Sequence, residues 1–78
     1  MERLGKVLHI SPTTGNLIVK AKTVFQVGVK VFDNKLREVG VIFDVLGPVV
    51  SPYVAIKPSH SSPEKFVNQV LYLLEKKR

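Results

Sequence analysis

Apolar and polar residues alternate along most of the chain, and clusters of turn-forming residues interrupt the alternation. Because successive side chains of a strand point to opposite faces of a sheet, this pattern predicts strands. The ranges expected to be strands are Leu4–Ile10, Leu17–Ala21, Val29–Phe32, Glu38–Leu46 and Tyr53–Lys57. Turn signals recur about every 8–12 residues, which is typical of a small all-β barrel.

The longest predicted strand, Glu38–Leu46, is apolar on both faces. Strict alternation gives one face Val39, Val41, Phe43 and Val45, and the other face Gly40, Ile42, Asp44 and Leu46. A strand of this kind is either deep in a sheet or covered on its outer face by something else. A chain of 78 residues is too short to cover both faces itself. We therefore expect a partner to cover one of them.

A short apolar connector follows this strand. Gly47-Pro48 ends the strand, because proline cannot donate to a ladder, and Val49-Val50 then precede Ser51-Pro52. A free loop would normally be polar here. Its prolines stiffen the connector, so little conformational entropy would be lost on binding. Tyr53 adds a ring for burial and a hydroxyl for a hydrogen bond at the rim of an interface.

This connector predicts a docking surface for a protein. Its expected members are Leu46, Gly47, Pro48, Val49, Pro52 and Tyr53, with Ile42 at the edge. The alternative is that Val49 and Val50 fold back into the open end of the barrel and Tyr53 closes it, because small barrels fill their ends with side chains.

Two segments fit more than one structure. The stretch Lys22–Gly28 suits either a strand or a loop that crosses between strands. Further on, Ser62-Pro63 predicts a helix start with a serine cap, and apolar residues at helical spacing allow a helix over Pro63–Lys76. The run Val70–Leu74 equally suits a buried strand. The pattern alone favours the helix.

Length and composition limit the protein class. Seventy-eight residues predict one domain, 1–78, with a small core. The absence of cysteine excludes disulfides, zinc fingers and thiol catalysis, and it fits an intracellular compartment. No run reaches the roughly 18 apolar residues of a membrane span. We expect a cytoplasmic protein with no membrane partner.

The formal charge of +6 suggests an anionic partner, such as RNA or a ribonucleoprotein. The cations are scattered, except for Lys76-Lys77-Arg78, which we expect to be solvated and to aid binding weakly. The six aromatic residues do not alternate with cations as in a platform for stacked bases. A stand-alone basic RNA-binding barrel is therefore an alternative function and not the first choice.

The sequence offers no catalytic set, no cofactor motif and no metal-ligand spacing. His9 and His60 are isolated, and isolated histidines are more often surface or packed residues than ligands. Asp44, between Phe43 and Val45, could act as a base if it were buried. We favour an outward carboxylate that pairs with a cation or caps a turn, and we rank an enzyme last.

The ordered pattern of this region resembles the signature of the Gar family, the subunit of box H/ACA ribonucleoproteins, in its short archaeal form. That signature is a glycine, a hydrophobic-acidic-hydrophobic strand, a Gly-Pro turn, a short link and an aromatic-led strand. The matching residues are Gly40, Asp44, Gly47-Pro48 and Pro52-Tyr53-Val54 through Lys57, and Val27–Asp33 fits the strand before them. The match covers nearly the whole chain. Gly-Pro alone is unspecific, but the ordered set is fairly specific.

The resemblance implies a six-stranded antiparallel barrel of the translation-elongation-factor type. It makes Val70–Leu74 the last strand and leaves only a helical turn near Pro63. We follow the resemblance over the periodicity, because closing a barrel needs that strand.

The resemblance also implies a non-catalytic role in RNA-guided pseudouridylation, rRNA processing and ribosome biogenesis. Family members bind the dyskerin-type pseudouridine synthase, alongside other H/ACA core proteins and the guide RNA, with little direct RNA contact. The Gly-Arg-rich tails of eukaryotic relatives do not occur in this sequence.

Overall fold

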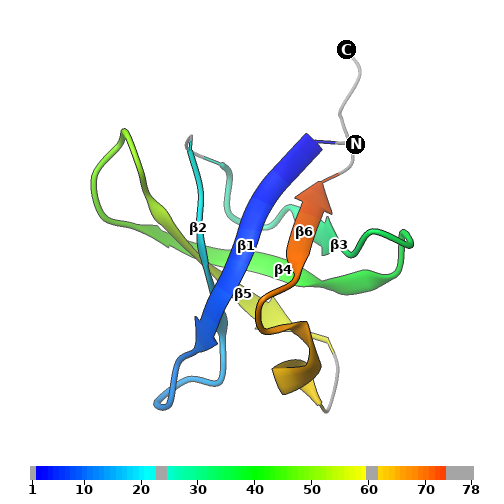
Figure 1. Cartoon of the computed structure of the whole chain (residues 1–78). Helices are drawn as coiled ribbons and strands as arrows, with labels where there is room; N and C mark the ends of the chain where they lie inside the picture. Colours follow the sequence, from blue (N-terminus) through cyan, green and yellow to red (C-terminus); the bar gives the residue numbers. More distant parts are fainter. Residues whose placement is uncertain (1, 23–24, 60–61, 74–78) are drawn as a thin grey trace.

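Six strands build the protein, and the computed structural model describes residues 2–22, 25–59 and 62–73 (Figure 1). The strands are β1 (Glu2–Ile10), β2 (Leu17–Lys20), β3 (Lys30–Phe32), β4 (Glu38–Leu46), β5 (Tyr53–Pro58) and β6 (Val70–Leu73). All pairs are antiparallel, in the order β1-β2-β5-β4-β3-β6, and β6 closes the barrel on β1. The predicted all-β, six-stranded antiparallel barrel is confirmed.

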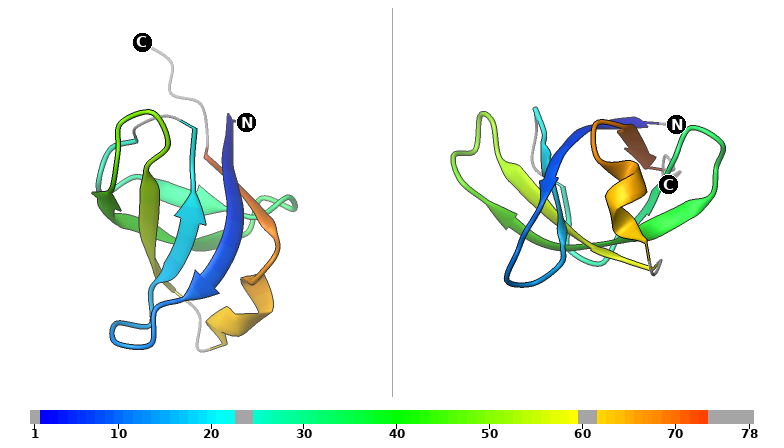
Figure 2. Two further views of the ribbon diagram at one scale, coloured as in Figure 1. Left: turned by 60° about the vertical axis from the view of Figure 1, so that its left-hand side comes forward. Right: turned by 60° about the horizontal axis from the view of Figure 1, so that its bottom comes forward.

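The core lies inside the barrel and is filled by aliphatic side chains from all six strands. The largest fully buried ones are Leu17, Ile42, Ile56, Leu71, Val7, Val19, Val31, Val39 and Val54. A 3-10 turn, η1 (Pro63–Phe66), lies at one end of the barrel and adds the buried ring of Phe66 to the core (Figure 2). Burial of this apolar surface is the main term that holds so small a domain together.

Strand β4 does not alternate as strictly as expected. It has one residue too many against β3, at Val39, and one too many against β5, at Phe43. Each extra residue is a β-bulge, which restarts the alternation of side chains. The predicted two-face assignment is therefore wrong: Val39 and Ile42 both enter the core, whereas Phe43 turns outward and is 56% exposed.

Gly40 lies between these bulges and allows the backbones of β4 and β5 to approach closely. A Cβ atom at this position would collide with the carbonyl oxygen of Lys57. Glycine is needed here because the backbones approach too closely for any side chain.

The two ambiguous segments have clear outcomes. The C-terminal segment is the turn η1 followed by strand β6, so the resemblance was right and the helical periodicity was wrong. Ser62 precedes η1 but makes no side-chain capping bond.

Strand β2 ends at Lys20, and no strand occurs in the described part of 22–28, residues 22 and 25–28. Leu74 and the basic tail Lys76-Lys77-Arg78 lie outside the described residues, as does His60.

Candidate protein-docking surface

The loop between β4 and β5 projects from the barrel (Figure 1). Leu46 and Tyr53 are the last cross-strand pair, and Gly47 then leaves the strand with a φ of 88°. That left-handed conformation favours glycine, because a side chain would be strained there. Inside the loop, the backbone N–H of Ser51 donates to the carbonyl of Pro48, at 3.2 Å. The loop is thus a compact turn and not an extended excursion.

A hydrogen bond also ties the end of this loop to the residue after β2. The N–H of Ala21 donates to the carbonyl oxygen of Pro52, at 2.9 Å. Both ends of the loop are therefore anchored through the backbone, by the Leu46–Tyr53 pair and by Pro52. The side chains between them take no part in that anchoring.

The two valines of the loop lie in solvent. Val49 is 75% exposed and Val50 is 83% exposed. The alternative in which they fill the open end of the barrel is therefore wrong. Leu46 and Tyr53 are also exposed, as are Gly47 and Pro48. We call the exposed set of Leu46, Gly47, Pro48, Val49, Val50 and Tyr53 the hairpin tip.

Two residues predicted for the docking surface are not at the surface. Ile42 is 1% exposed and belongs to the core, and Pro52 is fully buried. Burial of Ile42 follows from the bulge at Phe43, which sequence alternation could not reveal. Pro52 is buried where its carbonyl meets Ala21. Neither residue therefore belongs to a contact surface.

Tyr53 is held between two strands. Its cross-strand neighbour on β2 is Lys20, whose Nζ lies 5.9 Å from the centre of the tyrosine ring. A Cβ at Gly47 would lie 3.4 Å from Cδ2 of the ring, so the ring lies against the turn. Sequence reasoning missed Lys20, because its place beside Tyr53 depends on the β2–β5 register.

Phe43 is the second residue that sequence reasoning missed. Strict alternation placed it with Val39 on one face, but the bulge exposes its ring on the same strand as Leu46. Strand β4 therefore carries a second exposed apolar side chain besides Leu46. The only sequence signal was the three consecutive apolar residues Val41-Ile42-Phe43, where alternation cannot fix which face each residue takes.

Asp44, the candidate base, has a structural role. Asp44 is exposed, and its Oδ1 accepts a hydrogen bond from the N–H of Val45, at 2.8 Å, directly after the bulge. It therefore lies outward as expected and is not a base in an apolar pocket. Among the described residues, no cluster of three or more histidines and acids could hold a metal ion.

Asp33 is the acid that is buried. Its Oδ1 accepts hydrogen bonds from the N–H groups of Lys35 and Arg37, both at 2.9 Å, and its Oδ2 accepts one from Arg37 Nε, at 3.0 Å. Burial raises the pKa of the Asp33 carboxyl, but these hydrogen bonds and the Arg37 charge outweigh it and hold the pKa below its ordinary value. Asp33 therefore holds the turn between β3 and β4 through its own side chain.

A sequence model of the family described as the Gar1/Naf1 RNA binding region matches residues 1–78. The chain belongs to the Gar1/Naf1 family. An uncharacterized protein of Methanothermobacter thermautotrophicus is 38% identical over 71 residues, which cover 90% of this chain and 76% of that protein. An uncharacterized protein of Methanocaldococcus jannaschii is 37% identical over 60 residues, which cover 76% of this chain and 70% of that protein.

Membership of the Gar1/Naf1 family confirms the resemblance and indicates an RNA-associated role. The residues that carried the resemblance have distinct conformational reasons in this barrel. Gly40 permits a close approach of strands, Gly47 takes a left-handed turn, and Asp44 bonds the backbone at a bulge. The signature thus encodes the shape of β4, β5 and the hairpin tip. No helix among the described residues is long and apolar enough to cross a membrane.

Proposed function

We propose that this Gar1/Naf1 barrel is a non-catalytic accessory subunit of the box H/ACA RNA-guided pseudouridylation complex. It docks on the dyskerin-type pseudouridine synthase through the hairpin tip, and the other H/ACA core proteins and the guide RNA join the same complex. The observation that supports this most is the exposure of Val49 and Val50 in a loop whose ends are anchored. Contiguous exposed apolar residues mark interaction sites on small soluble proteins.

The composition of the hairpin tip favours a protein as its partner. None of its six members carries a charge. Contacts to RNA are made largely by cationic and polar side chains that reach phosphates, sugars and base edges. An apolar tip instead gains free energy by leaving water, at about 25 cal/mol for each Å² of apolar surface buried. The tip therefore suits a hydrophobic pocket on a protein.

The backbone of the hairpin tip is also preorganised for binding. It is fixed by the Leu46–Tyr53 pair, by the Ser51–Pro48 hydrogen bond and by the bond from Ala21 to Pro52. A preformed loop loses less conformational entropy on association than a free one. Tyr53, whose ring is partly supported by Lys20 and the turn, is suited to be the residue that contributes most.

In this proposal the chemistry belongs to the synthase. The synthase carries the catalytic aspartate, and this chain acts by holding it in a productive arrangement for the modification of rRNA. Asp44, the acid considered as a possible base, is exposed at a bulge, and the buried Asp33 is committed to a turn.

The test uses the full chain and the pseudouridine synthase of the same organism. Titration calorimetry should show that Val49→Asp weakens binding by about 2 kcal/mol or more, a factor of roughly 30 in Kd, because it places a charge in an apolar pocket. Leu36→Asp is the matched control. Leu36 is exposed and apolar but lies in the turn between β3 and β4, on the other side of the barrel (Figure 2).

Two results would contradict the proposal. One is an unchanged Kd for Val49→Asp together with a loss of binding for Leu36→Asp. The other is a steep fall in affinity with salt, since an apolar interface responds little to ionic strength whereas a charged one is screened.

A further inference from the structure

A cleft of about 440 Å³ lies beside the hairpin tip. It is bounded by the first half of β1, by the end of β2 with residues 21, 22 and 25, and by the loop residue Ser51. We call it the basic cleft, and its polar and aromatic members are Arg3, Lys6, Lys20, Lys22, Phe25 and Ser51.

The charge of the basic cleft is one-sided. Four of its lining residues are cations and none is acidic. None of these four cations forms an ion pair with any residue in the described part of the chain. Four like charges around one hollow raise the local positive potential, which attracts an anion and is relieved when one binds.

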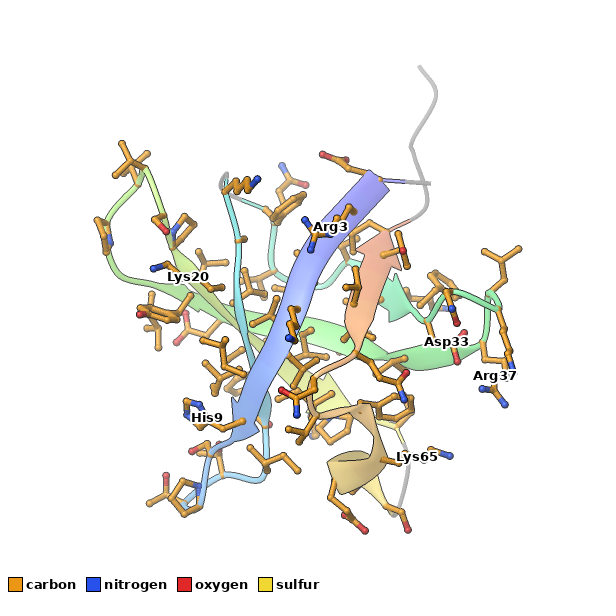
Figure 3. All side chains as sticks on the ribbon, in the orientation of Figure 1. Arg3, His9, Lys20, Asp33, Arg37 and Lys65 are labelled. Atoms are coloured by element: carbon orange, nitrogen blue, oxygen red, sulfur yellow. The ribbon has the colours of Figure 1, made fainter. Side chains whose placement is uncertain are left out.

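The fold gathers charges that the sequence scatters. Lys6 and Lys20 are direct cross-strand partners in the β1–β2 pair, although 14 positions separate their numbers, 6 and 20. Arg3 precedes Lys6 in β1, and Lys22 follows the end of β2. In Figure 3 the labelled Arg3 and Lys20 lie toward the end of the barrel away from Lys65. The cluster is therefore confined to one end.

The floor of the basic cleft is apolar and open. Leu4 and Ala21 are buried beneath it, and Gly5 has no side chain to fill it. A Cβ at Gly5 would collide with the carbonyl oxygen of Lys20, so the close approach of β1 and β2 requires glycine. At the margin, Phe25 packs against the core and is half-buried, so its ring also lines the cleft.

We infer that the basic cleft binds single-stranded RNA, with phosphates on its four cations and a base against Phe25. Cations that follow a backbone, together with an aromatic ring for stacking, are the elements of sequence-tolerant binding to single strands. The family description names an RNA binding region without saying which residues bind. The inference does not rest on docking at the hairpin tip, and it departs from the expectation of little direct RNA contact.

The basic cleft lies next to the hairpin tip, so RNA bound in it would lie beside a protein bound at the tip. Ser51 belongs both to the cleft wall and to the loop that carries the hairpin tip, and Lys20 lies over the ring of Tyr53. A protein bound at the tip and an RNA strand in the cleft would therefore be neighbours. The barrel would contact both components at once.

Fluorescence anisotropy of the full chain with a labelled 12-nucleotide single-stranded RNA of mixed sequence, in 50 mM salt, tests this. The double variant Lys6→Gln/Lys20→Gln should weaken binding at least tenfold and reduce the slope of log K against log salt by about 1.4, or about 0.7 for each lost phosphate contact. The control Lys57→Gln/Lys65→Gln removes the same charge from outside the cleft and should change binding less than threefold.

A second pair of variants tests the aromatic contact. Phe25→Leu should weaken RNA binding about fivefold, because a stacked base loses its partner, whereas Phe43→Leu, an exposed ring outside the cleft, should not. Circular dichroism checks that each variant is folded, and the single variant Lys20→Gln replaces the double one if that fails to fold.

Three outcomes would overturn the inference. The first is no measurable RNA binding by the wild type. The second is equal loss for the cleft and control lysine pairs, which would mean diffuse charge attraction. The third is equally tight binding of a decaglutamate peptide with no effect of Phe25→Leu on RNA binding, which would assign the cleft to an acidic protein segment.

Discussion

Two turns flank strand β4, and they use their side chains in opposite ways. The turn before it, from Asp33 to Arg37, satisfies its own backbone through one buried carboxylate. The hairpin tip after it is anchored by backbone bonds at its ends and leaves its side chains in solvent. Figure 2 shows the two turns on opposite sides of the barrel.

The Asp33 turn is a self-contained unit. The carboxylate is 2% exposed, and three hydrogen bonds reach it from two residues of the same turn. Hydrogen bonds to an ionised acceptor are stronger than those between neutral groups. The conformation of this turn is therefore specified locally, and Leu36 can keep a left-handed φ of 64°.

The hairpin tip has no equivalent of Asp33. Its side chains contribute neither charge nor capping, and its two valines face water. The two turns differ in what their exposed apolar side chains indicate. Such side chains indicate a binding surface only where the conformation of the turn does not depend on them. A turn held by its own side chains is explained by folding, whereas a turn held only at its ends has side chains left for binding.

The largest stability effect is expected at Asp33. Asp33→Ala leaves two backbone N–H groups and the Arg37 guanidinium without their acceptor, so the free energy of unfolding should fall by about 2–4 kcal/mol. Urea denaturation followed by circular dichroism measures this. Asp33→Asn keeps one oxygen acceptor and should lose about half as much. Equal stability of Asp33→Ala and wild type would show that the turn is held by other contacts.

A smaller effect is expected from pH. The pKa of Asp33 is lowered on folding, so the unfolded chain binds the proton more readily and stability rises with pH between the two pKa values. The contribution is complete above the ordinary pKa of about 3.9 and disappears as pH falls through the folded value. The stability difference between wild type and Asp33→Asn should therefore shrink between pH 6 and pH 2. A difference that is constant over this range would contradict the assignment.

The smallest stability effect is expected at the hairpin tip. Val49→Asp/Val50→Asp should change the free energy of unfolding by less than about 0.5 kcal/mol, because both side chains are already in water. The same urea titration measures it beside Asp33→Ala. A loss of more than about 2 kcal/mol would mean that the tip belongs to the core and that the contrast between the turns is false.

The barrel and the position of the tip could be predicted from sequence, for physical reasons. Turn residues such as Gly15-Asn16 and Gly47-Pro48 act locally, so they mark the ends of strands wherever they occur. Strand β6 could not be derived in this way. Its apolar spacing satisfies both helix and strand, and only pairing with β1 and β3 decides between them.

The details of β4 were hidden for the same reason. Alternation cannot show a bulge, so Ile42 was expected at the edge of the docking surface and proved to be core, while Phe43 proved to be exposed. The basic cleft could not be predicted from the sequence either. Lys6 and Lys20 look unrelated along the chain, and only the β1–β2 register places them side by side.

The closure of the barrel by β6 has a consequence for how the chain folds. Glu2 pairs with Leu73, so the last strand completes a ladder that the first strand began. Until that strand is available, β1 and β3 each have one unpaired edge, and such edges invite pairing with other chains. Contacts so distant in sequence are slow to form, since the loop entropy must be lost before they stabilise anything. The chain before closure, with β6 not yet paired, is therefore more exposed to aggregation than the finished barrel.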